Sequence, residues 1–285
     1  MVTRILANLW RIRVTVGYAT ALFLVASVLL ALGPGAQSRA VDQLSTNLHN
    51  LAHGRLVTLL GSAFVTAEGQ TYLLLPGLVC LLALAELLWR SRRLIQVFLL
   101  GHIGATVIVA VGLAVAIKLG WAPISISHAK DVGLSYGAVA VLGTLTAAIP
   151  GTWRPAWTVG WISVASVVIA FSGDFTAAGH AIALVLGIAA STRLHSAHLR
   201  RPGPQWTAFR AVLFAVAVAF GLLLLVGVSL PTAPVAVPAG LAAASAVWLT
   251  SRFRTGCCSV ATPRTPDVDR TAAHSRRASG PASCA

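Results

Sequence analysis

Two residues in apolar stretches of the sequence, Ser135 and His180, have side chains that together can carry out hydrolysis. An imidazole that accepts the proton of a serine hydroxyl is the minimum arrangement for nucleophilic attack on an acyl group. Unpaired N–H groups at the start of the helix that carries the serine can hold the resulting oxyanion. The alternative interpretation is helix packing, because Gly133 and Gly137 flank Ser135 with GxxxG spacing and small residues also surround His180.

The elements that must position these residues are membrane-spanning helices. Of the 285 residues, 57% are hydrophobic and only 10% are charged, whereas a soluble domain has about 25% charged residues. This composition excludes a water-soluble globule, a disordered chain and a disulfide-rich secreted fold. Long apolar runs without alternation predict helices and not barrel strands, so the expected fold is an all-α polytopic membrane protein. The four cysteines show no metal-ligand spacing, and we predict neither a metal nor another cofactor.

Eight apolar segments are long enough to be candidate spans, and the last of them is marginally short. They fall at about 14–32, 71–89, 94–117, 133–150, 156–172, 175–192, 208–229 and 235–250. If the N-terminus lies inside, 17 of the 21 basic residues fall in inside segments. This asymmetry predicts a multi-pass protein of the plasma (inner) membrane with both termini in the cytoplasm. It also explains the net charge of +14 without a nucleic-acid partner, and the lipid bilayer is the expected surrounding.

This topology brings the two candidate residues to the same depth. The fourth and sixth spans both run from outside to inside, which places Ser135 within a turn of the outer surface. His180 lies about 8 Å below that surface. Because both segments are rich in small residues, the two helices can approach closely, and the two side chains are expected to meet in a shallow, outward-facing site.

Three other regions carry weaker signals. The first outer loop, 33–70, has large apolar residues about three to four positions apart, which predicts short amphipathic helices in the membrane interface. His102 has Gly101 and Gly104 beside it, which favours helix packing over chemistry. The tail, 251–285, has few large apolar side chains and is expected to be disordered.

Taken together, these residues resemble the rhomboid intramembrane serine proteases. The triplet Gly133-Leu134-Ser135 is similar to the family's GxS serine motif, and the run from His180 through Ala183 to Gly187 is similar to its H-x-x-G-x-x-x-G helix. Segment 56–64 resembles the end of the membrane-embedded first loop of rhomboids. Glu86, which precedes a basic turn, also fits the rhomboid pattern. The resemblance implies a catalytic dyad of Ser135 and His180, with transmembrane helices as substrates or clients.

The resemblance also implies a domain organisation. Residues 1–13 would be a cytoplasmic segment, 14–192 a rhomboid-like six-helix core, 193–250 two additional transmembrane helices, and 251–285 the basic cytoplasmic tail.

The sequence departs from the family pattern around the oxyanion. Active rhomboids usually carry H-x-x-x-N on the second span, and the corresponding positions, counted back from Glu86, are Gln70 and Leu74. Gln70 can still donate a hydrogen bond, as can the backbone at Gly133, but Leu74 cannot. Tyr136 stands where the family keeps a glycine after the serine. The loss of one oxyanion donor costs a serine protease about 10²–10³ in rate.

Three functions are therefore weighed. The first is an intramembrane serine protease that cuts helices near the outer surface, and the second is a catalytically inactive rhomboid-like protein that binds membrane partners. The third, a small-solute transporter, is disfavoured because the sequence has no internal repeat, no paired carboxylates and no matched broken helices.

Overall fold

The computed structural model describes residues 9–55, 57–65, 70–129, 134–198 and 206–258. All regular elements in these ranges are helices, so the prediction of an all-α fold is confirmed. The chain divides into two units, residues 1–248 and 249–285. The candidate site lies in the first unit.

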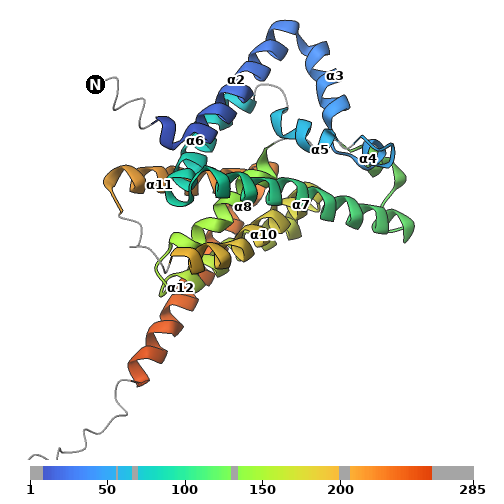
Figure 1. The fold of residues 1–285 in the computed structure, drawn as a ribbon. Coiled ribbons are helices and arrows are strands. Elements are labelled where there is room, and N and C mark those ends of the chain that lie inside the picture. Colours follow the sequence, from blue (N-terminus) through green and yellow to red (C-terminus); the bar gives the residue numbers. More distant parts are fainter. Residues whose placement is uncertain (1–8, 56, 66–69, 130–133, 199–205, 259–285) are drawn as a thin grey trace, which may run out of the picture. The chain divides into compact units, whose positions relative to one another are not determined.

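Seven helices are long and apolar enough to cross a membrane, which supports a multi-pass membrane protein (Figure 1). They are α2 (Arg13–Leu32), α6 (Gln70–Trp89), α7 (Ser91–Lys118), α9 (Arg154–Ser172), α10 (Phe175–His198), α11 (Ala208–Val226) and α12 (Ala233–Cys258). Their N-terminal ends lie within three residues of the predicted ones. Seven of the eight predicted spans therefore correspond to a long helix.

The fourth predicted span, 133–150, differs from the others. It forms the short helix α8 (Ser135–Thr144) and a 3-10 turn, η3 (Leu145–Ala148). Together these reach only about 20 Å, less than the roughly 30 Å of a bilayer core. Pro150 limits the segment, because a proline disfavours helical backbone at the residue before it, and Ile149 is extended there.

The first outer loop contains short helices, as predicted. They are α3 (Pro34–Leu44), α4 (Leu48–Ala52), α5 (Thr58–Gly61) and the 3-10 turn η1 (Ser62–Phe64). Two further 3-10 turns, η2 (Ile124–His128) and η4 (Gly227–Thr232), lie in other connections. The placement of the loop in the membrane interface stays a prediction.

Two predicted helix ends are too early. Helix α10 continues six residues beyond 192, to His198, and α12 continues eight residues beyond 250, to Cys258. The expectation of disorder from residue 251 is therefore wrong for 251–258. No proline occurs there to end the helix before Pro263. The rest of the tail, 259–285, lies outside the described residues.

Helix α8 forms the centre of the first unit. It packs against α7 and α10 and also contacts α6 and α11. Every residue of α8 after Ser135 is buried. The segment is therefore apolar because protein surrounds it, and its apolarity does not mark a full crossing of the bilayer.

The carboxylate of Glu86 ties α6 to the beginning of α2. It accepts hydrogen bonds from the backbone N–H groups of Val14 (3.1 Å) and Thr15 (2.9 Å) and from the Thr15 hydroxyl (2.7 Å). The Ser91 hydroxyl, at the start of α7, donates a fourth (2.6 Å). A negative charge at a helix N-terminus is favourable because it meets unpaired N–H groups and the positive end of the helix dipole. Glu86 thus joins three helices at one end of the unit.

Candidate functional site

Ser135 is the first residue of α8 and is half-buried. The preceding residue, Leu134, makes no side-chain hydrogen bond to the start of the helix. The first N–H groups of the helix therefore have no partner from the capping side chain, and their role in holding an oxyanion stays a prediction. Gly133, a predicted contributor, lies outside the described residues.

His180 lies five residues into α10 and is almost fully buried, with 3% of its surface exposed. Five residues of helix correspond to about 8 Å along the axis, and the depth of His180 below the outer surface stays a prediction. Because α10 packs against α8 along much of its length, the two predicted site residues are on neighbouring helices.

Small residues allow the backbones of α8 and α10 to touch. A Cβ atom at Gly187 would fall on the backbone of Ala140, 2.8 Å from its carbonyl carbon. In the reverse direction, a Cβ atom at Gly143 would lie 2.6 Å from the carbonyl oxygen of Leu184. The close approach predicted from the small residues is therefore confirmed, and it extends from mid-helix toward the C-terminal end of α8.

The imidazole of His180 has no hydrogen-bond partner on either ring nitrogen among the described residues. It follows that Ser135 and His180 are not hydrogen-bonded to each other in this structure. Their assignment as a catalytic dyad stays a prediction.

Tyr136 covers the imidazole. Its ring is 2% exposed and meets the His180 ring at right angles, with the centroids 5.3 Å apart. The phenol end lies against Gly179, where an added Cβ would collide with the tyrosine Cζ and Oη. Tyr136 therefore fills space beside the candidate base.

The predicted support on the second span is only partly described. Gln70 is the first residue of α6, and its side chain lies outside the described residues. Leu74, one turn further, is partly buried against the hydrophobic core. The leucine therefore contributes packing at the position that the resemblance assigns to an oxyanion donor, and this assignment stays a prediction.

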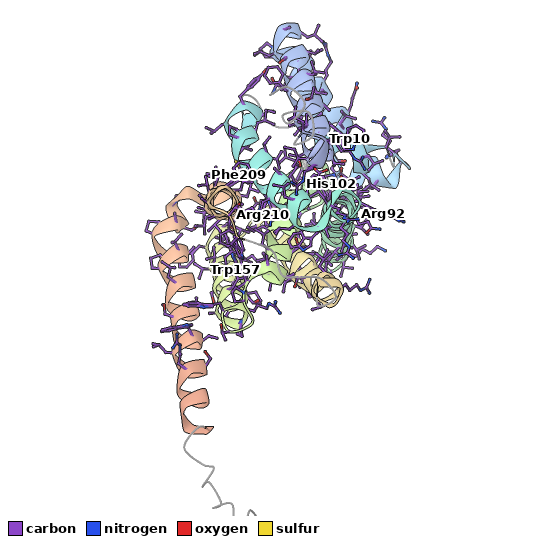
Figure 2. The ribbon with its side chains drawn as sticks, turned by 60° about the vertical axis from the view of Figure 1, so that its left-hand side comes forward. Trp10, Arg92, His102, Trp157, Phe209 and Arg210 are labelled. Atoms are coloured by element: carbon purple, nitrogen blue, oxygen red, sulfur yellow. The ribbon has the colours of Figure 1, made fainter. Side chains whose placement is uncertain are left out.

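A second serine–histidine pair was missed by the sequence reasoning. The Ser62 hydroxyl in η1 lies 3.2 Å from Nε2 of His102 in α7, and both residues are 2% exposed. His102 is labelled among the side chains of the bundle in Figure 2. Thr46 Oγ1 lies 2.9 Å from the same hydroxyl and 3.0 Å from the Thr58 carbonyl oxygen. His102 therefore anchors the first outer loop on α7, besides the close helix packing that Gly101 makes with Ala140.

No group of three or more His, Cys, Asp and Glu side chains with the proximity needed for a metal ion occurs in the part of the chain that the structure describes.

Comparison with known proteins identifies a family model, described as rhomboid-like protein, that matches residues 12–198. This range begins just before α2 and ends with α10, so it contains both Ser135 and His180. Helices α11 and α12 follow it. No curated protein and no solved structure matches the chain.

Proposed function

The chain belongs to the rhomboid-like family, and we propose that it is an intramembrane serine protease with Ser135 as the nucleophile and His180 as the general base. The observation that carries this proposal is the buried imidazole of His180. Its two nitrogens have no hydrogen-bond partner among the described residues. An unsatisfied buried polar group costs about 1–3 kcal/mol, and such groups in native structures call for an explanation such as a catalytic role.

The position of Ser135 supports the same assignment. Its hydroxyl is at the start of α8, on the helix that packs against the one carrying His180. Hydrogen bonds between a serine and its base are often long before substrate binds, so the present geometry is compatible with the dyad. The half-buried state of Ser135 leaves part of it accessible.

In this mechanism the hydroxyl of Ser135 attacks the carbonyl carbon of a peptide bond in a transmembrane helix that has entered the site. The serine proton passes to His180, and the N–H groups at the start of α8 hold the oxyanion. The imidazolium then protonates the leaving amine as the acyl-enzyme forms. A water molecule completes the cycle by attacking the ester, with His180 again accepting and returning the proton.

Tyr136 determines whether the base is reachable. With its ring against His180 and Gly179, substrate and water reach the imidazole only after the phenol moves. We therefore propose that the site is closed at rest and that substrate entry displaces the ring.

The second candidate is the catalytically inactive rhomboid-like protein that binds membrane partners. The packing of Tyr136 favours it, because a ring that permanently fills the cavity excludes the water that hydrolysis needs. The apolar side chain of Leu74 in the place of an oxyanion donor points the same way.

Fluorophosphonate labelling of the full chain in detergent or vesicles separates the two candidates. The protease is expected to label, and Ser135→Ala and His180→Ala are each expected to abolish the label. Ser62→Ala is the matched control, because it removes the hydroxyl of the other Ser–His pair and should leave labelling unchanged. Labelling that survives Ser135→Ala contradicts the proposal. The absence of labelling in the wild type and in Tyr136→Gly supports the inactive binder.

The remaining sequence-based assignments complete the proposal. The protein is placed in the plasma (inner) membrane with both termini in the cytoplasm, on the distribution of its basic residues. The six-helix core is assigned to 14–192 and the additional helices to 193–250. Under this topology Ser135 faces the outer side, so cleavage takes place near the outer surface.

A further inference from the structure

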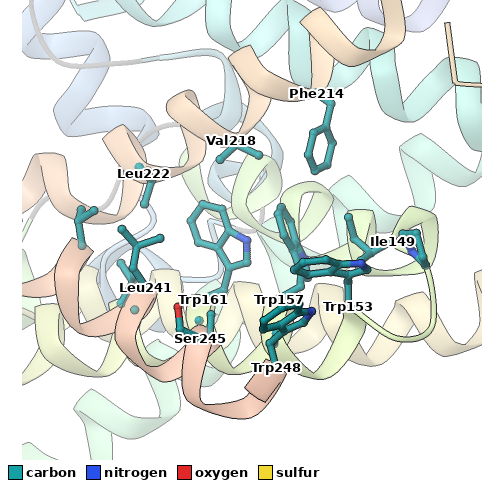
Figure 3. Close-up of a pocket in the computed structure, with 17 residues that line it drawn as sticks. Ile149, Trp153, Trp157, Trp161, Phe214, Val218, Leu222, Leu241, Ser245 and Trp248 are labelled. Carbon is teal, nitrogen blue, oxygen red and sulfur yellow. The ribbon is translucent and has the colours of Figure 1, made fainter. Parts of the chain in front are cut away.

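An apolar groove of about 630 Å³ lies between α9, α11 and α12, beyond the proposed active site. This volume is within the range of about 300–1,000 Å³ that is typical of ligand sites. Four indoles gather along it, those of Trp153, Trp157, Trp161 and Trp248 (Figure 3). Two of its three walls, α11 and α12, follow the residues that the family model matches.

The three helices that form the groove have defined directions relative to one another. Trp153 stacks on Trp248 with ring centroids 5.3 Å apart, whereas Gly160 on α9 faces Ala244 and Gly240 on α12. Helices α9 and α12 are therefore antiparallel. The ring of Trp157 lies 5.5 Å from that of Phe214, near the beginning of α11, so α9 and α11 begin at the same end of the groove.

The length of the groove matches one leaflet of a bilayer. On α9 its lining extends from Trp153 to Val164, which corresponds to about 16 Å of helix. Half of a bilayer core is about 15 Å. The base is closed, because Trp161 and Val164 are 6% and 4% exposed, and the sides are open, because Leu241 is 64% exposed.

The lining of the groove suits an acyl chain. Apart from Ser245, the residues that line it are aliphatic, aromatic, glycine or proline. Water is also unfavourable there, because an apolar cavity offers it too few hydrogen-bond partners.

Two arginines lie at the end where α9 and α11 begin. Arg154 is the first residue of α9, and its Nε donates to the carbonyl oxygen of Ile149 (2.7 Å), a lining residue. Arg210 is one turn before Phe214 on α11, so the two residues share a face of that helix. Figure 2 labels Arg210 and Trp157 on these neighbouring helices.

We propose that this groove is a binding site for an anionic phospholipid of the leaflet at that end, which our topology identifies as the inner one. An acyl chain lies along the indoles, and the phosphate headgroup lies near Arg154 and Arg210. Basic residues at the membrane surface attract anionic lipids, and indoles are favoured where an apolar region meets the polar interface.

The test uses acyl-chain bromine, a contact quencher of indole fluorescence, in vesicles that contain phosphatidylglycerol and phosphatidylcholine. The full chain is reconstituted with phenylalanine at the four tryptophans outside the groove, Trp10, Trp89, Trp121 and Trp206. Only one lipid class carries bromine at a time. We expect brominated phosphatidylglycerol to quench several-fold more strongly than brominated phosphatidylcholine at equal mole fraction.

Two pairs of variants make the test specific to the groove. Ser245→Phe fills the groove from an exposed position of α12 and should lower quenching by both lipids, whereas Ala242→Phe, which is also exposed but does not line the groove, should not. Arg210→Gln should reduce the preference for phosphatidylglycerol several-fold. Arg193→Gln, an exposed arginine on α10, should leave this preference unchanged. Unchanged helical circular dichroism shows that each variant is folded.

Three results would overturn the proposal. Equal quenching by both lipids in the reporter protein would indicate ordinary boundary lipid. If quenching by brominated lipid were the same in Ser245→Phe and Ala242→Phe, the quenched indoles would lie outside the groove. Weak quenching by both lipids, together with cross-linking of two chains through cysteines at the groove, would show that a second copy covers it.

Discussion

Gly187 is one of the points at which α8 and α10, the helices that carry Ser135 and His180, come into close contact. In Gly187→Ala the added Cβ would lie 2.8 and 2.9 Å from the carbonyl carbon and Cα of Ala140. Ordinary contact between carbon atoms is at about 3.5–4.0 Å, so the helices must separate by roughly 0.6 Å or more at this point. No flexible side chain can relieve the clash, because the contacted atoms belong to the backbone.

The magnitude follows from two opposing effects. Overpacking a well-filled core costs about 1–3 kcal/mol. Because the added Cβ meets backbone atoms, we place the cost of Gly187→Ala at the upper end of this range. Replacing glycine by alanine inside a helix returns about 1 kcal/mol. We therefore expect Gly187→Ala to lower the free energy of unfolding by about 2 kcal/mol. The matched control is Gly112→Ala on α7, where an added Cβ meets nothing within 4 Å, and it should raise stability by up to about 1 kcal/mol.

The free energy of unfolding is measured by titration with SDS in mixed micelles, followed by circular dichroism, for the wild type and both variants. A misplacement of about 1 Å can cost 10²-fold in rate, so fluorophosphonate labelling should fall at least tenfold in Gly187→Ala and stay unchanged in Gly112→Ala. If the two variants are equally stable, the backbone contact at Gly187 does not set the spacing of the helices.

Three further outcomes are expected. Glu86→Ala leaves four donors without their acceptor and should lower the free energy of unfolding by about 3 kcal/mol or more. Ser91→Ala should lower it by about 1 kcal/mol. A similar loss of stability for both variants in the SDS titration contradicts the capping role of Glu86. Tyr136→Gly should cost about 3–5 kcal/mol of packing and leave serine-dependent labelling equal or higher, as tested against the double variant with Ser135→Ala. A cysteine at Arg39, in a chain without its native cysteines, should react with an impermeant maleimide from outside; reaction only from inside reverses the topology.

The positions of the long helices could be predicted from the sequence because hydrocarbon imposes a simple requirement. A segment that crosses the membrane must be apolar over its whole length, and its backbone N–H and C=O groups must be hydrogen-bonded within the segment. Segment 133–150 meets the same description for another reason. Helix α8 is apolar because it is surrounded by α7 and α10, and a one-dimensional pattern does not distinguish lipid from protein as the surrounding medium. The short central helix could therefore not be recognised in advance.

Only part of the candidate site could be predicted from the sequence. The small residues on the fourth and sixth spans indicate close packing, and the backbone contact at Gly187 bears this out. The direction of each side chain depends on the rotation of its helix about its axis. In a helix that is surrounded by protein or lipid on all sides, this rotation leaves no period in the sequence, because there is no polar face to mark it. The contact of Tyr136 with His180 became visible only in three dimensions.

The two serine–histidine pairs show why hydrogen-bond distance alone does not identify a nucleophile. Ser62 has the shorter approach to an imidazole, yet it is 2% exposed and also lies within hydrogen-bond distance of Thr46. A substrate cannot reach it without lifting the loop from α7. Ser135 has no such bond to its histidine, but it is half-buried and is the first residue of α8, where the capping side chain makes no hydrogen bond to the helix. Ser62→Ala removes a partner of buried His102 and should therefore cost about 1–3 kcal/mol of stability while labelling persists, because the hydroxyl joins the loop to α7 and takes no part in chemistry.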